Sequence, residues 1–381
     1  MKAQRLASVK EYYFSAKLRE VAALVQAGKP IINMGIGSPD LAPHPSVVEA
    51  LNKGMSHPRA HMYQSYQGLP ELRKAIADFY QRFYQVELDS TEEILPLMGS
   101  KEGIMHISMA FLDKGDQVLI PNPGYPTYSS VTRLLEAEPI TYDLSIENHW
   151  QPDFAALEAM DTTKVKLMWL NYPHMPTGAV ALKGTFKKLI DWAKARNILL
   201  INDNPYSFIL NHNPQSILSI PGAKEVALEL NSLSKAFNMA GWRVGMLSGN
   251  ASILKEVLKV KSNMDSGMFF GVQQGSIAAL QAEKEWFDSL NAVYRTRRDK
   301  VETLATLVGT AFDTTSVGMF VWAKLPKGAV DATTYIDTLL HENDIFIAPG
   351  TIFGSQGEGY IRFSLCVPDE KIQEAINRMQ K

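Results

Sequence analysis

A lysine and an arginine eight positions apart are the clearest chemical feature of the chain. Lys235 and Arg243 lie in the run Ser-Leu-Ser-Lys-Ala-Phe-Asn-Met-Ala-Gly-Trp-Arg, which begins at Ser232. A lysine amine forms a Schiff base with an aldehyde, whereas an arginine fork and nearby hydroxyl groups hold a phosphate. These groups together suit a phosphorylated aldehyde such as pyridoxal 5'-phosphate. Most lysines are instead solvated surface charges, so the partners of Lys235 decide between the two interpretations.

A carboxylate at the end of an apolar run is one such partner. Asp203 follows Ile-Leu-Leu-Ile-Asn at 198–202, and Tyr206 comes three residues later. In open parallel sheets the ligand lies beyond the carboxyl ends of the strands. A carboxylate in that place keeps a pyridine nitrogen protonated, because each charge stabilises the other. The alternative is a structural turn, since Asp-Asn-Pro is favourable turn sequence.

A loop of small residues follows a second apolar run. Gly-Ser-Lys-Glu-Gly at 99–103 comes after Leu-Pro-Leu-Met and opens a helical pattern. A helix N-terminus offers unpaired backbone amides and the positive end of a dipole, which suit a phosphate. We expect the amides of Ser100 and Lys101, rather than the lysine ammonium, to bind. An ordinary helix cap would have a similar sequence.

Two further loops follow apolar runs in the same way. Tyr125 ends Pro-Asn-Pro-Gly-Tyr, and its ring could stack on a flat pyridine; core packing is the alternative. Asn171 begins Asn-Tyr-Pro-His-Met-Pro-Thr-Gly, whose prolines predict a rigid turn at the same edge of the sheet.

The apolar runs predict an α/β fold with a mostly parallel central sheet. The runs at 117–121, 165–170, 198–202, 226–230 and 244–248 lack strict alternation, as expected where helices cover both faces of a sheet. A long helical pattern covers 283–307. A strand pattern at 319–325, a helical one at 334–342 and a strand pattern at 359–365 follow it. We expect a large domain over 46–284 and a small α+β domain formed by 1–45 and 285–381.

Length and composition narrow the class of protein. With 381 residues, two domains are the ordinary expectation. A net charge of -2 without a basic cluster argues against nucleic-acid and acidic-membrane partners. The single cysteine, Cys366, and histidines without ligand spacing predict no metal site. No apolar run reaches the roughly 18 residues of a membrane span, and we expect a cytoplasmic protein.

From 35 to 362 the chain resembles the class I/II aminotransferases of pyridoxal-phosphate fold type I. The pattern Ser-x-Ser-Lys-x-x-x-Met-x-Gly-Trp-Arg is matched at 232–243, and Asp-x-x-Tyr is matched at 203–206. The pattern Tyr-x4-Gly-x2-Glu-Leu-Arg is matched at 63–73. In motif detail the chain is most similar to the LL-diaminopimelate aminotransferase branch, through its segments at 99–103, 171–173 and 261–267.

The resemblance implies a role for each residue that matches a family motif. Lys235 would bond the aldehyde, Asp203 the ring nitrogen and Tyr206 the phenolic oxygen. Tyr125 would stack on the ring, with Asn171 beside it. Ser232, Arg243 and the amides of Ser100 and Lys101 would hold the phosphate.

Two further matches concern the substrate and the oligomer. Arg362 would clamp the substrate α-carboxylate with its bidentate fork, helped by the Gly37 amide. Tyr63 in such proteins reaches the phosphate of the neighbouring subunit, so the resemblance implies a homodimer with shared active sites.

One position departs from the family pattern. The family usually has an asparagine before Pro-Thr-Gly, and this chain has Met175. A thioether cannot donate a hydrogen bond to the cofactor's phenolic oxygen. Either Asn171 or His174 replaces that contact, or Tyr206 holds the oxygen alone.

The expected activity is a ping-pong transamination between an L-amino acid and a 2-oxo acid in amino-acid metabolism. A carbon–sulfur β-lyase or a decarboxylase of the same fold is the alternative. A regulatory pyridoxal-phosphate domain would need a DNA-binding module, for which the chain has neither the length nor a basic region. A nicotinamide dehydrogenase would need a Gly-x-Gly-x-x-Gly turn, which the sequence lacks. The sequence does not reveal which amino acid is used.

Overall fold

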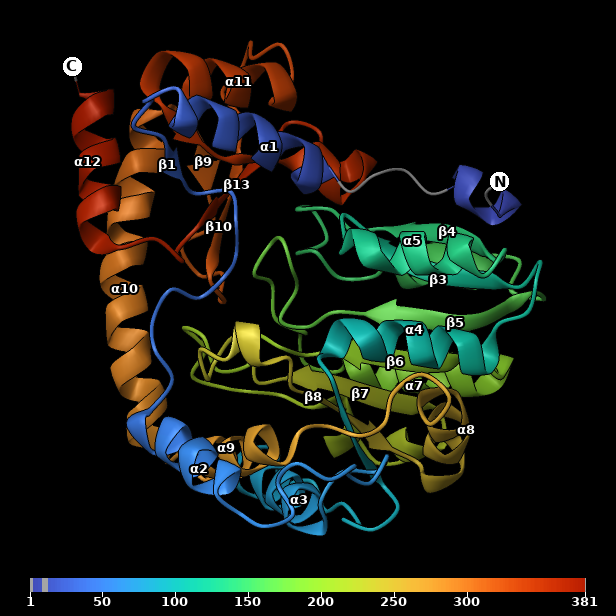
Figure 1. Ribbon diagram of the computed structural model, residues 1–381. Helices are drawn as coiled ribbons and strands as arrows, with labels where there is room; N and C mark the ends of the chain where they lie inside the picture. The colour runs from blue at the N-terminus through green and yellow to red at the C-terminus, as the bar shows by residue number, and fades with distance from the viewer. Residues whose placement is uncertain (1–2, 9–12, 381) are drawn as a thin grey trace.

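A seven-stranded sheet with helices on both faces forms the centre of the molecule (Figure 1). The computed structural model describes residues 3–8 and 13–380, and the side chains of 8, 13 and 14 are not described. The strand order is β2 (Ile94–Leu97), β8 (Gly245–Gly249), β7 (Ala227–Ser232), β6 (Leu199–Asp203), β5 (Val165–Leu170), β3 (Gln117–Asn122) and β4 (Glu138–Asp143). The run from β7 to β4 is parallel, whereas β8 is antiparallel to both its neighbours. The predicted α/β class with a mostly parallel sheet is therefore confirmed.

The strand β5 explains why the sequence lacks alternation. Leu167 and Trp169 join the apolar cluster under α4 (Ser100–Phe111), α5 (Pro126–Leu134) and α8 (Ala251–Lys261). Met168 and Leu170 belong to the cluster on the other face, together with α7 (Thr185–Arg196). Because helices bury both faces of the sheet, the side chains that point to either face are apolar. The strand therefore shows no alternation of apolar and polar residues.

The C-terminal part forms a second, smaller layered unit. Its antiparallel sheet has the order β12 (Ala348–Pro349), β13 (Tyr360–Ser364), β10 (Phe320–Lys324) and β9 (Ala311–Phe312). The helices α11 (Ala332–Asn343) and α12 (Asp369–Met379) pack around it, and α10 (Lys284–Leu307) runs along one side of the molecule toward the lower helices (Figure 1). The remaining helices are α2 (Pro45–Met55), α3 (Pro70–Tyr84), α6 (Phe154–Ala159), α9 (Phe270–Leu280) and the short η1 (Gln4–Ser8), η2 (Ile217–Ser219), η3 (Ala223–Glu225), η4 (Ala240–Trp242), η5 (Gly350–Phe353) and η6 (Ser355–Gly357).

The N-terminal segment packs on this C-terminal unit. Strand β1 (Ile32–Asn33) pairs in parallel with β11 (Ile345–Phe346). Helix α1 (Tyr13–Gln26) lies beside α11, and the Lys17 ammonium is 2.6 Å from Asp337 Oδ1. The N-terminal segment and the C-terminal unit thus pack together, as the expected small domain requires. The boundaries at 45 and 285 stay a prediction. None of the described helices is long and apolar enough to cross a membrane, and the cytoplasmic location also stays a prediction.

A bidentate ion pair ties the loop after β1 to α10. Arg297 Nη1 and Nη2 lie 2.7 and 2.8 Å from the two carboxylate oxygens of Asp40. Nη1 also donates to the main-chain oxygen of Leu365, at 3.1 Å. Because Arg297 is buried, its fork fixes the 35–40 loop between the long helix and the end of β13.

We expect Arg297→Lys to lower the free energy of unfolding by about 1–3 kcal/mol, because a lysine cannot form the planar two-point contact. Chemical denaturation measures the change. Arg295→Lys, at an exposed position of the same helix, is the matched control and should stay within about 0.5 kcal/mol of the wild type. Equal losses in the two variants would contradict a special role for the buried fork.

Candidate active site

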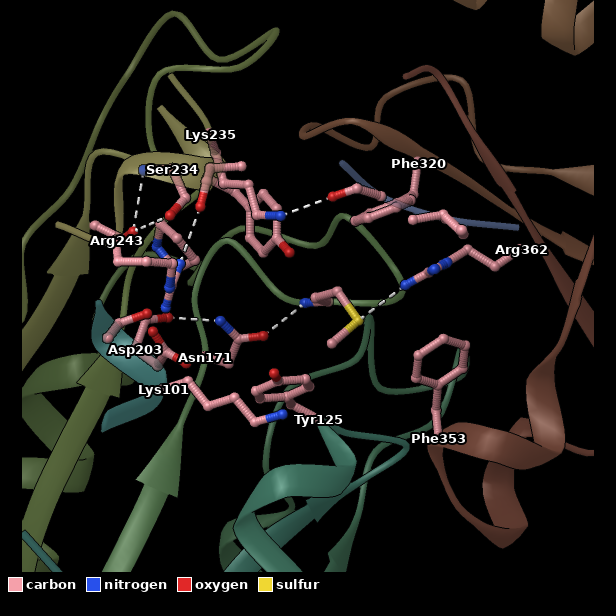
Figure 2. Close-up of a pocket in the computed structure, with 18 of the residues that line it drawn as sticks. Lys101, Tyr125, Asn171, Asp203, Ser234, Lys235, Arg243, Phe320, Phe353 and Arg362 are labelled. Atoms are coloured by element: carbon pink, nitrogen blue, oxygen red, sulfur yellow. Dashed lines mark hydrogen bonds between the residues drawn. The ribbon is translucent and has the colours of Figure 1, made fainter. Parts of the chain in front are cut away.

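A cavity of about 560 Å³ opens where the carboxyl ends of the parallel strands face the C-terminal unit (Figures 1 and 2). It gathers all but one of the residues expected at the site: Gly37, Ser100, Lys101, Tyr125, Asn171, Asp203, Tyr206, Ser232, Lys235, Arg243 and Arg362. The exception is Tyr63. This volume is in the range that holds a small ligand.

One end of the cavity collects groups that attract an anion. Ser232 ends β7, and its hydroxyl donates to Ser234 Oγ at 2.8 Å. Arg243 lies over the Gly99 turn that opens α4, where a Cβ on Gly99 would come within 1.9 Å of Arg243 Nη2. Glycine at this turn, with φ +93°, therefore lets the guanidinium reach the helix N-terminus. Two hydroxyls, a guanidinium and the first-turn amides of α4 converge there.

A buried carboxylate lines the cavity on the same side as Arg243 (Figure 2). Asp203 ends β6, and its Oδ2 accepts a hydrogen bond from Tyr128 Oη at 2.8 Å. Its Oδ1 is buried and receives no hydrogen bond from any residue in the described chain. Burial raises the pKa of Asp203 to about 7, although Tyr128 and Lys235 oppose the shift. Without a cation beside Oδ1, this acid binds a proton near neutral pH.

The lysine approaches the cavity from the loop after β7. Lys235 Nζ donates to the main-chain oxygen of Gly37 at 2.7 Å. Burial lowers the pKa of Lys235; Cys366 and Asp203 oppose this shift, whereas Arg362 and Arg243 add to it. An amine with a lowered pKa is more often neutral and so serves as a nucleophile or base.

Two tyrosines line the cavity between these groups. Lys235 Nζ lies 5.9 Å from the ring centroid of Tyr206. The ring of Tyr125 meets that of Tyr128 edge-on, at 5.6 Å between centroids. Burial raises the pKa of both Tyr125 and Tyr206, so both phenols keep their protons at neutral pH.

The opposite end of the cavity holds a guanidinium between aromatic rings (Figure 2). The Arg362 guanidinium carbon lies 3.9 Å from the ring centroid of Phe320 and 4.7 Å from that of Phe353. Its Nη2 donates to the Gly35 oxygen at 2.8 Å, and its Nη1 points at the Met175 sulfur at 3.3 Å. Flanking rings and a thioether hold the fork in one plane, ready for a carboxylate.

The turn before Pro-Thr-Gly brings Met175 and Asn171 to the cavity but turns His174 away. Asn171 Nδ2 donates to the Asp203 main-chain oxygen at 2.5 Å, while its Oδ1 accepts from the Met175 amide at 2.9 Å. The His174 ring lies between Thr177 Oγ1 and the Pro123 oxygen, and burial lowers its pKa to about 3. Of the two proposed replacements for the usual asparagine, Asn171 is therefore the one that lines the cavity.

Tyr63 lies on the surface, outside the cavity lining. Its side chain is 91% exposed. It belongs to an exposed apolar group, which we call the tyrosine patch: Met62, Tyr63, Tyr66, Met264 and Phe269. The two segments of this patch are joined where Lys261 Nζ donates to the Tyr66 oxygen at 2.8 Å.

Sequence reasoning missed three aromatic residues. Tyr128 lies one helical turn after Tyr125, and this spacing could have placed it beside the same ligand. Phe320 and Phe353 come from the C-terminal unit and belong to no motif, so only the tertiary structure brings them to Arg362.

One group of potential metal ligands lies outside the cavity. Glu102, His106 and Asp265 bring ligand atoms within 4.8 Å of one another. However, the Lys261 ammonium is 2.9 Å from Asp265 and already balances its charge. We derive no metal site from this group, and the expectation of a metal-free protein stays a prediction.

The raised pKa of Asp203 predicts a pH dependence of stability for the cofactor-free protein. An unfolded aspartate ionises near pH 4, whereas the folded chain keeps its proton up to about pH 7. The folded state binds more protons in this window, so the free energy of unfolding falls as pH rises from about 4 to 7. Asp203→Asn should remove a few kcal/mol of this fall, at about 1.4 kcal/mol per pKa unit.

Denaturation curves between pH 4 and pH 8 measure the effect. Glu229, whose pKa burial also raises to about 7, titrates in both proteins, so the comparison isolates Asp203. The exposed Asp191→Asn on α7 is the control. An unchanged slope in Asp203→Asn would mean that this carboxyl ionises as freely in the fold as in water.

Comparison with known proteins connects this geometry to a family. Residues 29–379 match the family aminotransferase class I and II. The chain is 39% identical over 378 residues to an LL-diaminopimelate aminotransferase of Aquifex aeolicus, with 99% of this chain and 97% of that protein covered. The structure of apo-BacF from Bacillus subtilis superposes with a TM-score of 0.95 at 36% identity, covering 100% of this chain and 98% of that one. An aspartate aminotransferase variant of Thermus thermophilus gives 0.92 at 25% identity, covering 99% and 98%.

These matches cover nearly the whole chain, so they apply to both the sheet and the C-terminal unit. No observation on the structure or on these relatives favours the carbon–sulfur lyase or decarboxylase alternative. The resemblance seen in the sequence motifs is confirmed: the chain belongs to the class I and II aminotransferases and is a pyridoxal-phosphate-dependent transaminase of fold type I.

Proposed function

We propose that the cavity binds pyridoxal 5'-phosphate and that its residues transfer an amino group from an L-amino acid to a 2-oxo acid. The observation that carries this proposal is the position of three different grips around one cavity. The anion site of Ser232, Arg243 and the α4 amides lines the cavity. Figure 2 shows the carboxylate of Asp203 on the same side as Arg243, with the amine of Lys235 between them and Arg362.

The unpaired oxygen of Asp203 supports the fit of the cofactor. A buried acceptor without a donor costs free energy, and a protonated ring nitrogen would satisfy it. The anion site suits the phosphate, because a guanidinium, hydroxyls and helix amides all favour a charged oxygen. Tyr125 would supply a ring face, and the Tyr206 hydroxyl and the Asn171 amide, which line the cavity, would donate to the phenolic oxygen.

When bound, the cofactor supplies an electron sink for the bond that breaks at the substrate α-carbon. Lys235 would bond the cofactor's aldehyde carbon, and its amine, once released, would move the α-proton. Because burial lowers the pKa of this amine, it gives up its own proton more readily than a solvated lysine and can then accept the α-proton. Arg362 holds the α-carboxylate in a bidentate contact, with the Gly37 amide beside it. Asp203 stays ionised against the cationic ring, which reverses the pKa shift of the cofactor-free chain.

We also propose a homodimer in which the tyrosine patch faces a second copy. Tyr63 is almost fully exposed and bears a hydroxyl with no place in its own chain's cavity. The surrounding apolar side chains of the patch favour burial against a protein surface. In this dimer the Tyr63 hydroxyl of each chain reaches the phosphate site of the other.

We expect Lys235→Ala to lose turnover by at least about 1,000-fold, because the nucleophile and the proton carrier are the same group. The variant should still bind the cofactor without a covalent bond, through the anion site and Asp203. Steady-state assays and borohydride labelling followed by peptide mass spectrometry measure both effects. The exposed Lys187→Ala on α7 should keep wild-type activity and labelling. Transamination retained by Lys235→Ala would overturn the assignment.

Mixing two impaired variants tests the shared site, provided that the cofactor concentration is low enough to leave Tyr63→Phe largely unloaded. Tyr63→Phe should weaken cofactor binding by about tenfold, the value of one lost hydrogen bond to a charged group. If Tyr63 serves the neighbouring chain, a heterodimer of Tyr63→Phe with Lys235→Ala contains one site with both groups intact. Activity should therefore return when the two are unfolded and refolded together. Mixtures that stay at the level of Tyr63→Phe alone would mean that each chain builds its own site.

A further inference from the structure

We infer that the site selects amino acids with an apolar, preferably aromatic, side chain over those with a second charged group. This inference rests on the proposed function and concerns the part of the cavity beyond the α-carbon. The observation behind it is a set of four apolar side chains that line the cavity, Leu18, Ile36, Phe320 and Phe353, which we call the wall. Phe320 and Phe353 flank Arg362 (Figure 2).

The position of Ile36 defines where the substrate side chain begins. The Gly35 oxygen accepts from Arg362, and the Gly37 oxygen accepts from Lys235. Ile36 therefore lies between the residues whose main-chain oxygens contact the α-carboxylate clamp, Arg362, and the amine that would move the α-proton, Lys235. Its side chain lines the cavity and is 36% exposed, so a substrate side chain that leaves the α-carbon meets it first.

Rigid contacts hold the wall in place. A Cβ on Gly37 would come within 2.3 Å of the Phe320 ring. The loop therefore packs so closely on this ring that only glycine fits at position 37. Leu18 comes from α1, which the neighbouring Lys17 anchors to Asp337 at 2.6 Å. Phe353 is buried against Trp322, at 5.9 Å between ring centroids.

The described residues that line the cavity include five charged side chains, Lys101, Asp203, Lys235, Arg243 and Arg362. Four of them already have places in the proposed reaction: Asp203, Lys235 and Arg243 meet the cofactor, and Arg362 meets the α-carboxylate. The fifth, Lys101, is exposed at the start of α4, and its side chain extends toward Tyr125 (Figure 2). The apolar wall contributes no acid or base of its own, so a distal carboxylate or ammonium would lose water without gaining an ionic partner there.

An aromatic or long aliphatic side chain gains on the same wall. It buries apolar surface against Ile36 and Leu18, and a ring can pack edge-to-face on Phe353. A site of this kind distinguishes apolar from charged side chains by about tenfold or more. The LL-diaminopimelate named for several relatives carries a second ammonium and a second carboxylate, and the wall disfavours both.

Binding of unreactive acids to the holoenzyme tests the inference without turnover. Isothermal titration calorimetry would compare 3-phenylpropionate, which has one carboxylate and a ring, with glutarate and pimelate, which have two carboxylates. We expect 3-phenylpropionate to bind at least about tenfold more tightly than either diacid. Equal or tighter binding of a diacid would overturn the inference, and loss of that binding in Lys101→Ala would assign the second grip to the Lys101 ammonium.

A variant of the wall provides the reciprocal test. Ile36→Arg should strengthen glutarate binding by about tenfold and weaken 3-phenylpropionate binding, because it adds a cation beside the α-carbon. Leu182→Arg places the same change at a site that is 47% exposed and outside the cavity, and it should alter neither affinity. The comparison of ligands on the wild type decides the inference even where the Ile36 variant does not fold.

A half-reaction screen separates this inference from the proposed function. The absorbance of the bound cofactor would be followed with phenylalanine, glutamate and LL-diaminopimelate in turn. Conversion by phenylalanine, with slower conversion by the other two, supports both proposals. Conversion by glutamate or diaminopimelate but not by phenylalanine overturns the side-chain inference alone. No conversion by these three, nor by the rest of the twenty amino acids tested next, overturns the transamination itself.

Discussion

The burial of the Asp203 carboxylate is the constraint on which the site depends. Its position at the end of β6 is fixed by the parallel register with β5 and β7, and one of its two oxygens has Tyr128 as a donor. A fully satisfied carboxylate would be easier to bury but would have no oxygen left for a ligand. In the fold, Asp203 Oδ1 is buried without a hydrogen-bond donor, which is unfavourable. A cation that binds beside this oxygen therefore gains a favourable interaction that the folded chain alone does not make.

A single short loop connects the chemistry to both halves of the molecule. The Gly35 and Gly37 oxygens accept from Arg362 and Lys235, and Asp40, a few residues on, pairs with Arg297. Arg362 belongs to the C-terminal sheet, whereas Lys235 lies in the loop after β7 of the central sheet. The distance between the substrate clamp and the amine is thus set by this loop. Any change that loosens the Asp40–Arg297 pair should therefore affect the alignment of the substrate as well as stability.

The sequence predicts the strand-end residues well because parallel strands end at one edge. Asn171, Asp203 and Ser232 each follow or end a strand, and those strands, β5, β6 and β7, are neighbours in the sheet. The order of the sheet therefore brings them into one cavity without any information from distant contacts. Lys235 and Arg243 share one loop, so their spacing in the sequence carries over into the structure.

The sequence predicts much less where distant segments meet. Phe320 and Phe353 reach Arg362 only because β10, β13 and η5 assemble with the loop after β1. Their role depends on ring packing, and apolar residues in such places are indistinguishable from core residues by type. The sequence motif shows that Met175 replaces the asparagine usual in the family. Its contact with Arg362 is visible only in the folded structure. The proposed role of Tyr63 is in another chain, so in the structure of a single chain this residue lies at the surface.

The cavity has a positively charged guanidinium on each side, Arg243 and Arg362, and both act on Lys235. Lys235, Arg243 and Arg362 surround one carboxylate, and the two guanidinium groups cannot lose their protons near neutral pH. The Lys235 amine is therefore the group of the three that can lose its proton. Burial lowers the pKa of Lys235, and both guanidiniums add to the shift. The same cations that would hold a phosphate at one end and an α-carboxylate at the other also make the lysine a base. Neutralising either guanidinium would weaken an anion grip and raise the pKa of Lys235 together, because one field produces both effects.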